Sequence, residues 1–351
     1  MINSLQMFDK ILRKISYDIG IDLGTSNVLV YVRGKGILIR EPSVITIHRK
    51  TKNVVAVGDE AKKMLGKTPP SLIAVRPLRG GVIADFYCAQ QMLIHFIETV
   101  HSMPSKFPKL PRPRVVIGIP SGITSVEKKA VIDASKRAGA RETFLIDEPM
   151  AAAIGAGLDV SKPRGNIIVD MGGGTTEIAV ISLFGIVVSR SLKTAGDRLD
   201  QEIVKYARDK YNLLLGEKTA EQVKCKFGST FEFKDEKSIT AILAGRDLKT
   251  GLPRSVEVSP AEIRNALRAP VYEIIGAVKD TIEDTPAELM PDILKNGIVL
   301  AGGTSLLKGF SQLMEQEIKV PVRVAEDPIT CVVRGCARVL ESDFLLEKIT
   351  S

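Results

Sequence analysis

The 351-residue chain contains no tryptophan, only three histidines and 5% aromatic residues. So few aromatic side chains argue against a protein that stacks nucleic-acid bases. The four cysteines, Cys88, Cys225, Cys331 and Cys336, form no Cys-x-x-Cys pair, and we interpret them as reduced core residues rather than metal ligands. No apolar run approaches the roughly 18 residues that a membrane-spanning helix needs, and no N-terminal signal peptide is evident. These absences predict a globular cytosolic protein.

The remaining composition is that of a folded protein of about two domains. Hydrophobic residues make up 44% of the chain and charged residues 26%, which is enough apolar side chain for a sizeable core. A length of 351 residues corresponds to roughly two domains of ordinary size. The net charge of +8 is compatible with nucleic acid or with an anionic membrane as a partner. Because aromatic residues are scarce, we expect no nucleic-acid partner.

The stretch from Val169 to Ser182 predicts a β-hairpin that binds phosphate. Two apolar runs flank a turn that contains three glycines and two threonines. Glycine has no Cβ, so backbone N–H groups in such a turn can close on an anion, and threonine hydroxyls add donors. Asp170 ends the first run, where its carboxylate can hold a hydrated Mg²⁺ beside the phosphates. The predicted phosphate-binding residues are Gly172, Gly173, Gly174 and Thr175.

The same pattern occurs near the start of the chain. Between Ile19 and Tyr31, an apolar run ends in Asp22, and a second run follows a short polar turn. In both places another glycine and a third apolar strand come next, so we interpret the two β-meanders as an internal duplication. Two related halves facing each other would place Asp22 and Asp170 on opposite walls of one cleft. The first turn adds Gly24, Thr25, Ser26 and Asn27 to the predicted phosphate ligands.

A further acidic residue, Glu148, lies at a predicted strand-to-helix junction. Residues 143–147 form the predicted strand, and Pro149 suits a first helical turn. The small residues up to Gly157 let this helix cross close to another backbone. Phosphoryl transfer to water needs a residue that orients or deprotonates the water, and Glu148 is our candidate. Its alternative role is to stabilise the helix N-terminus through the helix dipole.

Two stretches in the second half are predicted to contact a nucleoside. In the helix expected over 219–227, Glu221 and Lys224 are one turn apart and share a face. They can reach a ribose and an adenine, or they can pair with each other. The stretch 298–307 predicts a strand, a turn at Gly302 and Gly303, and the start of a helix whose dipole favours a phosphate.

Two segments combine apolar side chains with positive charge. Residues 1–17 predict a short amphipathic helix, and the proline-rich loop 102–114 carries four basic residues, the last of them Arg114, and no acidic one. Both patterns are typical of a protein that lies on an anionic membrane surface. The alternative is that the helix packs on the protein's own core. The predicted membrane-contacting residues are Leu5, Phe8, Leu12, Ile15, Met103, Phe107 and Leu110.

Together, these motifs resemble those of the actin, sugar kinase and heat-shock chaperone ATPase superfamily. The phosphate motifs are Asp22–Asn27 and Val169–Glu177, and the adenosine motif is Ile298–Leu307. Two connectors between the domains match at Ile146–Gly157 and Thr330–Leu340. Within the superfamily the chain is similar to the MreB family, the bacterial actins that determine rod shape. This resemblance covers residues 18–340 and extends to tracts outside the nucleotide motifs.

The resemblance implies an α/β, actin-like ATPase fold with two duplicated RNase-H-like domains, each with a smaller inserted subdomain. The expected parts are an N-terminal amphipathic segment over 1–17, a first domain over 18–160 with an insertion at about 41–83, and a second domain over 161–351 with an insertion at about 201–255. The resemblance also implies ATP or ADP with Mg²⁺, which Asp22 and Asp170 hold through water, and a water activated by Glu148. The implied nucleoside or phosphate contacts are Glu221, Gln222, Val223, Lys224, Gly302, Gly303, Thr304 and Ser305.

For function, the resemblance implies a filament at the inner face of the cell membrane, on the cytoplasmic side. Slow ATP hydrolysis would accompany polymerisation into paired protofilaments, which organise cell-wall synthesis with membrane proteins of the cell-elongation machinery. The alternative is a small-molecule kinase of the sugar-kinase type, for which residues 201–255 offer no clear acceptor site. A chaperone ATPase would need a peptide-binding domain after the nucleotide domain, and we expect none because the sequence stops at Ser351.

Overall fold

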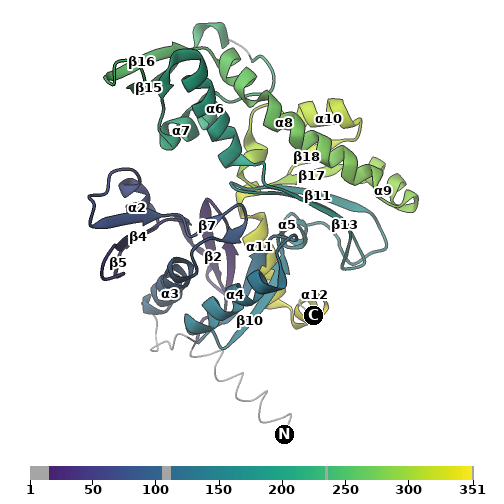
Figure 1. Ribbon diagram of the computed structural model, residues 1–351. Coiled ribbons are helices and arrows are strands. Elements are labelled where there is room, and N and C mark those ends of the chain that lie inside the picture. Colours follow the sequence, from purple (N-terminus) through teal and green to yellow (C-terminus); the bar gives the residue numbers. More distant parts are fainter. Residues whose placement is uncertain (1–15, 105–111, 234–235, 350–351) are drawn as a thin grey trace. The chain divides into compact units, whose positions relative to one another are not determined.

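The computed structural model describes residues 16–104, 112–233 and 236–349, which form two compact units (Figure 1). The first unit holds the described residues up to Pro163, together with Ser182–Ile186 and the residues from Ile329 onward. The second unit holds Arg164–Ile181 and Val187–Pro328. The predicted domain boundary at residue 160 stays a prediction, but by their contacts the C-terminal helices belong to the first unit.

One five-stranded sheet forms the centre of the first unit, in the order β10-β9-β1-β2-β3. β1 pairs antiparallel with β2, β2 pairs antiparallel with β3, and β1, β9 and β10 run parallel. The register aligns Asp22 with Gly118 and Gly118 with Ile146, so the ends of the parallel strands meet at one edge. The strands are β1 (Ile19–Leu23), β2 (Asn27–Val32), β3 (Gly36–Pro42), β9 (Arg114–Ile119) and β10 (Glu142–Asp147).

The second unit repeats this sheet in the order β13-β12-β11-β17-β18. β11 pairs antiparallel with β12 and parallel with β17, and β17 pairs parallel with β18. Asp170 lies opposite Ala301, as Asp22 lies opposite Gly118. The predicted internal duplication is therefore confirmed. The strands are β11 (Asn166–Met171), β12 (Thr176–Ser182), β13 (Gly185–Leu192), β17 (Ile298–Ala301) and β18 (Val322–Val324).

Helices and two small sheets, β5-β4-β6 and β7-β8, complete the first unit. The pattern Thr124-x-x-Glu127 predicts a capping box at the start of α4, and the structure forms it, with Glu127 and Thr124 bonded to each other's backbone N–H groups. Apolar residues of α3 such as Phe96 pack with the five-stranded sheet into one core. The helices are α2 (Asp59–Met64), α3 (Phe86–Ser102), α4 (Ser125–Arg137), α5 (Glu148–Gly155), α11 (Cys331–Glu341) and α12 (Asp343–Ile349). The inserted strands are β4 (Ile45–His48), β5 (Val54–Val57), β6 (Leu72–Val75), β7 (Leu78–Arg79) and β8 (Val82–Ile83).

The second unit has its own core and its own insertion. Its core joins the five-stranded sheet to the long helix α8, which begins with a capping box between Ser259 and Glu262. The helices are α6 (Gly196–Tyr211), α7 (Glu217–Phe227), α8 (Pro260–Glu283), α9 (Met290–Asn296) and α10 (Phe310–Ile318). The inserted strands are β14 (Leu213–Leu214), β15 (Ala241–Asp247) and β16 (Pro253–Val258). The 3₁₀ turns η1 (Glu236–Ser238), η2 (Ala287–Leu289) and η3 (Gly303–Leu306) lie in this unit, and η4 (Pro328–Thr330) spans its boundary with the first unit.

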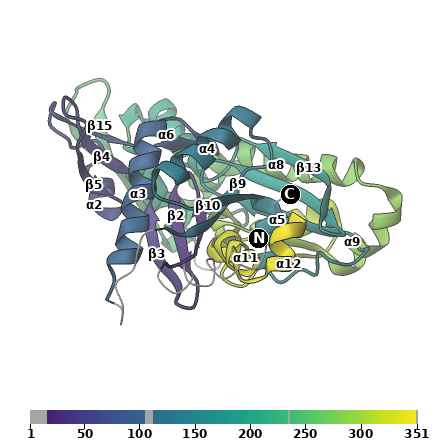
Figure 2. The same ribbon diagram turned by 90° about the horizontal axis from the view of Figure 1, so that it is seen from below.

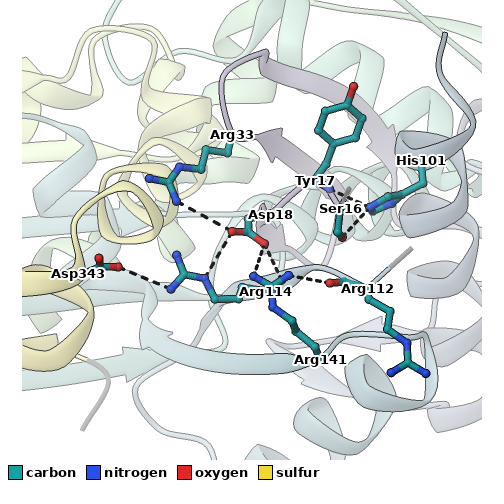
Figure 3. A network of polar contacts seen from close by, with 9 residues as sticks. All are labelled: Ser16, Tyr17, Asp18, Arg33, His101, Arg112, Arg114, Arg141 and Asp343. Carbon is teal, nitrogen blue, oxygen red and sulfur yellow. Dashed lines mark hydrogen bonds and ion pairs between the residues drawn. The ribbon is translucent and has the colours of Figure 1, made fainter. Parts of the chain in front are cut away.

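A buried carboxylate ties together the starts of the three parallel strands of the first unit. Figure 3 shows arginines from several elements around Asp18, which is 3% exposed. Its Oδ1 accepts the backbone N–H of Arg114 at 2.9 Å and pairs with Arg141 Nη2 at 3.0 Å, while its Oδ2 lies 3.4 Å from Arg114 Nε. The sequence pattern assigns Arg114 both to the basic loop 102–114 and to the start of a buried strand over 114–119; the structure confirms the strand, and the charge of Arg114 does not belong to the surface of the loop. Arg114 is 4% exposed and begins β9, because Asp18 compensates its charge.

Helices α5 and α11 cross at very short distance within the first unit. Both views show the two helices next to each other (Figures 1 and 2). A Cβ at Gly155 would lie 1.8 Å from the carbonyl oxygen of Cys331, and a Cβ at Gly335 would lie 1.9 Å from that of Ala151. Only glycine allows this approach, so the prediction of a small-residue crossing in these two segments is confirmed.

Candidate functional site

The turn between β1 and β2 presents the first set of predicted phosphate ligands. A Cβ at Gly24 would lie 2.7 Å from the carbonyl oxygen of Asn27, so the turn is too tight for a side chain there. The Ser43 hydroxyl donates to the carbonyl oxygen of Gly24, and the Ser43 N–H donates to that of Ser26 at 2.9 Å. The Thr25 side chain is buried. Ser43, which directly follows β3, thus fixes the conformation of the turn through these two hydrogen bonds.

Two of the predicted acidic residues lie together in the first unit. Asp22 is the second-to-last residue of β1, and Glu148 is the first residue of α5 and 8% exposed. Burial raises the pKa of the Cys336 thiol well above its usual value, and the carboxylates of Asp22 and Glu148 raise it further, since both lie near the sulfur. Burial also raises the pKa of Asp22 to about 7. The structure therefore brings together the predicted metal ligand and the predicted water-activating residue of this unit.

Gly118 makes room for this arrangement. It lies between Asp22 and Ile146 in the sheet, and a Cβ there would be 2.8 Å from Val332 Cγ1 and 3.6 Å from Glu148 Cγ. Sequence analysis missed Gly118. The signal was available, because a single glycine inside an apolar strand often marks a close approach of another chain segment.

The glycine turn between β11 and β12 is held from behind by two other segments. The carbonyl oxygen of Gly172 accepts the Gly196 N–H at 3.2 Å and the Thr304 hydroxyl at 2.8 Å. The carbonyl oxygen of Gly173 accepts the Asp197 N–H at 2.7 Å. The described peptide bonds are trans, so each N–H points opposite to the preceding carbonyl. The N–H groups of Gly173 and Gly174 therefore point away from α6, as a phosphate-binding turn requires.

Gly302 closes against the end of β11. Its φ is +78°, and a Cβ there would lie 2.2 Å from the carbonyl oxygen of Met171 and 2.8 Å from Asp170 Oδ1. The prediction that backbone approaches closely at this glycine is confirmed. The prediction of a helix start directly after it is wrong, because Gly303–Leu306 forms a 3₁₀ turn and α10 begins only at Phe310. A single 3₁₀ turn has too few aligned peptides to act as a helix dipole.

Helix α7 divides its predicted ligand residues between two faces. Val223 is 5% exposed and packs in the core of the second unit, so its side chain faces away from the candidate site. Gln222 is exposed, and Glu221 is half-buried. Lys224 forms an ion pair with Asp200 of α6, with 2.9 Å between Nζ and Oδ1. The sequence left two alternatives for Lys224, a contact with the nucleoside or a pair with Glu221. The structure adds a third, a pair with an aspartate on another helix.

The second unit therefore brings three sequence-distant segments to the start of α6. An added Cβ at Gly196 would lie 3.1 Å from Thr304 Oγ1, 3.2 Å from Lys224 Nζ and 3.4 Å from the carbonyl oxygen of Gly172. Neither Gly196 nor Asp200 is among the residues predicted from the sequence, and α6 begins at Gly196, before the expected insertion at about 201–255. Asp197 and Asp200 share one face of a helix that follows a phosphate motif, which is the signal that could have revealed Asp200.

The acidic residues at the ends of β1 and β11 fit a hydrated metal ion. Asp22 and Asp170 hold corresponding positions in the two sheets, and Asp170 is 6% exposed. Mg²⁺ is usually held by one or two carboxylates together with water and substrate phosphates. Within the described residues, no group of three or more His, Cys, Asp or Glu side chains could hold a metal ion alone. Asp22 and Asp170 belong to different units, so their shared role in one cleft stays a prediction.

Most of the predicted membrane-contacting residues lie outside the described structure. These are Leu5, Phe8, Leu12, Ile15, Phe107 and Leu110. Met103 is described and lies directly after α3, where it is partly exposed. A search of the described helices finds none with the length and hydropathy to cross a bilayer.

Comparison with known proteins finds close relatives over nearly the whole chain. The family described as MreB/Mbl protein matches residues 16–348. The chain is 48% identical over 331 residues to the cell shape-determining protein Mbl of Bacillus cereus, covering 94% of this chain and 98% of the relative. It is 48% identical over 339 residues to the cell shape-determining protein MreB of Escherichia coli, covering 95% and 96%.

Solved structures give the same result for the fold. The crystal structure of MreB5 of Spiroplasma citri bound to ADP has a TM-score of 0.87 and 38% identity, covering 95% of this chain and 98% of that one. A structure titled MamK double helical filament has a TM-score of 0.77 at 22% identity, covering 93% and 99%, and this likeness concerns the fold alone. The actin-like fold expected from the sequence is thereby confirmed.

Proposed function

The chain belongs to the MreB/Mbl family, and from this premise we propose that it is a nucleotide-binding protein that forms filaments and determines cell shape. The observation that carries the proposal is the 48% identity with cell shape-determining proteins over nearly the full length of both chains. Nucleotide binding is supported by MreB5 of Spiroplasma citri, which has been solved with ADP and with AMPPNP at 38% and 37% identity.

In the proposed complex, each unit contributes one glycine turn to the phosphates of ATP or ADP. The first turn offers Gly24, Thr25, Ser26 and Asn27, and the second offers Gly172–Thr175, where two N–H groups point away from α6. Lys224 and Glu221, with the backbone at Gly302–Ser305, are proposed to contact the nucleoside. Mg²⁺, held through water by Asp22 and Asp170, would neutralise charge on the phosphates.

We propose that Glu148 orients the water that attacks the terminal phosphate. Its carboxylate begins α5 beside Asp22, and Gly118 leaves space at the sheet edge below it. Hydrolysis would be slow, since the proposed task of the reaction is to time filament assembly rather than to make product. At this position Glu148 can also stabilise the N-terminus of α5 through the helix dipole, and the two roles are compatible.

We further propose that the filaments are paired, lie on the cytoplasmic side of the inner membrane and engage membrane proteins of the cell-elongation machinery. The amphipathic pattern of residues 1–17 and the basic, apolar pattern of the loop 102–114 support the membrane contact.

Sedimentation tests this proposal against the kinase alternative. The purified chain is centrifuged with ATP and Mg²⁺, with ADP, and without nucleotide, and the pellets are imaged on anionic lipid. The proposal predicts filaments in the pellet with ATP. A chain that stays soluble under all conditions and phosphorylates a sugar would contradict it.

A further inference from the structure

Lys224 is held by two partners on the neighbouring helix α6. Its Nζ lies 2.9 Å from Asp200 Oδ1 and donates a hydrogen bond to the carbonyl oxygen of Gly196 at 2.8 Å. Both side chains are largely buried, with 15% of Lys224 and 13% of Asp200 exposed. A lysine side chain has four flexible methylene groups, so two fixed partners remove most of its freedom.

The ammonium of Lys224 retains capacity for a ligand. It has three N–H donors; one donates to the carbonyl oxygen of Gly196, and the ammonium faces Asp200 Oδ1 at 2.9 Å as an ion pair. Within the described part of the chain, no third partner accompanies these two. The ammonium also lies beside Gly196, whose N–H is bonded to the carbonyl oxygen of Gly172 in the phosphate turn. The remaining donor is therefore next to the candidate site and suits an oxygen acceptor.

The ion pair is poorly explained as a device for stability. Burial raises the pKa of Asp200 to about 6, the charge of Lys224 lowers it, and the carboxylates of Glu221 and Asp197 raise it. These three side chains are the charged groups on α6 and α7 that act on Asp200. A buried ion pair contributes little net stability compared with apolar packing, because both charges must be desolvated. The ion pair is better explained by the fixed position that it gives the Lys224 ammonium beside Gly196.

We propose that Asp200 is a positioning residue that holds Lys224 so that its third N–H donates to a ribose hydroxyl of the bound nucleotide. This inference rests on the nucleotide binding proposed above and adds a residue that acts through Lys224 without touching the ligand. An ionised Asp200 keeps the ammonium beside Gly196. A neutral residue at this position releases the side chain, and the ribose contact is lost while the phosphate contacts of the glycine turns remain.

The test compares Asp200→Asn with the parent for two ligands, ADP and 2′,3′-dideoxy-ADP, by calorimetric titration at pH 7.5. We expect the affinity of Asp200→Asn for ADP to fall about tenfold, the size of effect expected for one charge-assisted hydrogen bond, with affinity for the dideoxy ligand unchanged within about twofold. The matched control is Asp209→Asn, an exposed aspartate on the same helix that pairs with Arg208. It should bind both ligands like the parent.

A pH series adds a second measurement. In the parent, the affinity ratio of ADP to the dideoxy ligand should fall as the pH drops through about 6, because Asp200 becomes neutral. In Asp200→Asn the ratio should be low at every pH. Equal losses for both ligands, or ADP affinity equal to that of the parent, would overturn the inference. If the parent binds neither ligand, the proposed nucleotide binding fails, and the inference fails with it.

Discussion

Replacing Gly335 by alanine tests the close crossing of α5 and α11 in the first unit. The new Cβ would lie 1.9 Å from the carbonyl oxygen and 2.7 Å from the Cα of Ala151. Both atoms belong to the backbone of a buried helix, so no side chain can rotate to relieve the clash. The two helices must move apart, and the apolar contacts between them are lost.

The size of the effect follows from this geometry. Overpacking a buried core typically costs about 1–3 kcal/mol, and a clash with backbone puts Gly335→Ala near the upper end, at about 3 kcal/mol. For domains of roughly 150–250 residues, 1 kcal/mol shifts Tm by about 2–4 °C. We therefore expect Gly335→Ala to lower the Tm of the protein by about 6–12 °C.

The matched control is Gly276→Ala in the middle of α8. A Cβ at Gly276 meets no atom within 4 Å, so the substitution adds helix propensity without a clash. It should stabilise the second unit by about 1 kcal/mol. Scanning calorimetry of the parent and both variants measures the two effects side by side. A Tm for Gly335→Ala within about 2 °C of the parent would refute the reasoning about the helix crossing.

Three further predictions concern the water-activating residue, the membrane contact and one buried ion pair. Glu148→Ala should keep ADP affinity and slow phosphate release from ATP by about 100-fold; hydrolysis at the parent's rate would remove Glu148 from the mechanism. Deletion of residues 1–15, or Phe107→Ser, should weaken flotation with anionic liposomes while ATP hydrolysis is unchanged, and unaltered flotation of both variants and of their combination would reject the membrane contact. The hydrogen bond from Arg264 holds the pKa of Glu236 below its usual range, so this carboxylate stabilises the fold above its unfolded pKa and loses that contribution as the pH falls through the folded value. Glu236→Gln should therefore destabilise the protein in urea titrations at pH 7 by about 1 kcal/mol and progressively less in acid; a constant difference would contradict this account.

The sequence predicted the sheets and their duplication because the signals were local. Apolar runs that end in Asp22 and Asp170, each followed by glycine and hydroxyl residues, define hairpins through their own turn chemistry. The capping box at Thr124 and Glu127 is equally local, since both partners lie within four residues of each other. Such features need no knowledge of the rest of the chain, and the structure confirms them.

What the sequence could not predict depends on contacts between distant segments. Asp200 meets Lys224 only because α6 and α7 pack together, and the charge of Arg114 at the start of β9 is compensated by Asp18, which lies just before β1. The short 3₁₀ turn after Gly302 replaces the expected helix for a similar reason: Thr304 bonds back to the glycine turn at Gly172. Neither helical propensity nor charge pattern contains this information.

The central claim is that two duplicated glycine turns hold one nucleotide together. A crystal structure of this chain with an ATP analogue and Mg²⁺ tests it most directly. The account predicts a single nucleotide whose phosphates contact both the turn after Asp22 and the turn after Asp170, with both carboxylates reaching the metal through water. A nucleotide bound to one turn alone, with the other carboxylate remote from the metal, would contradict it.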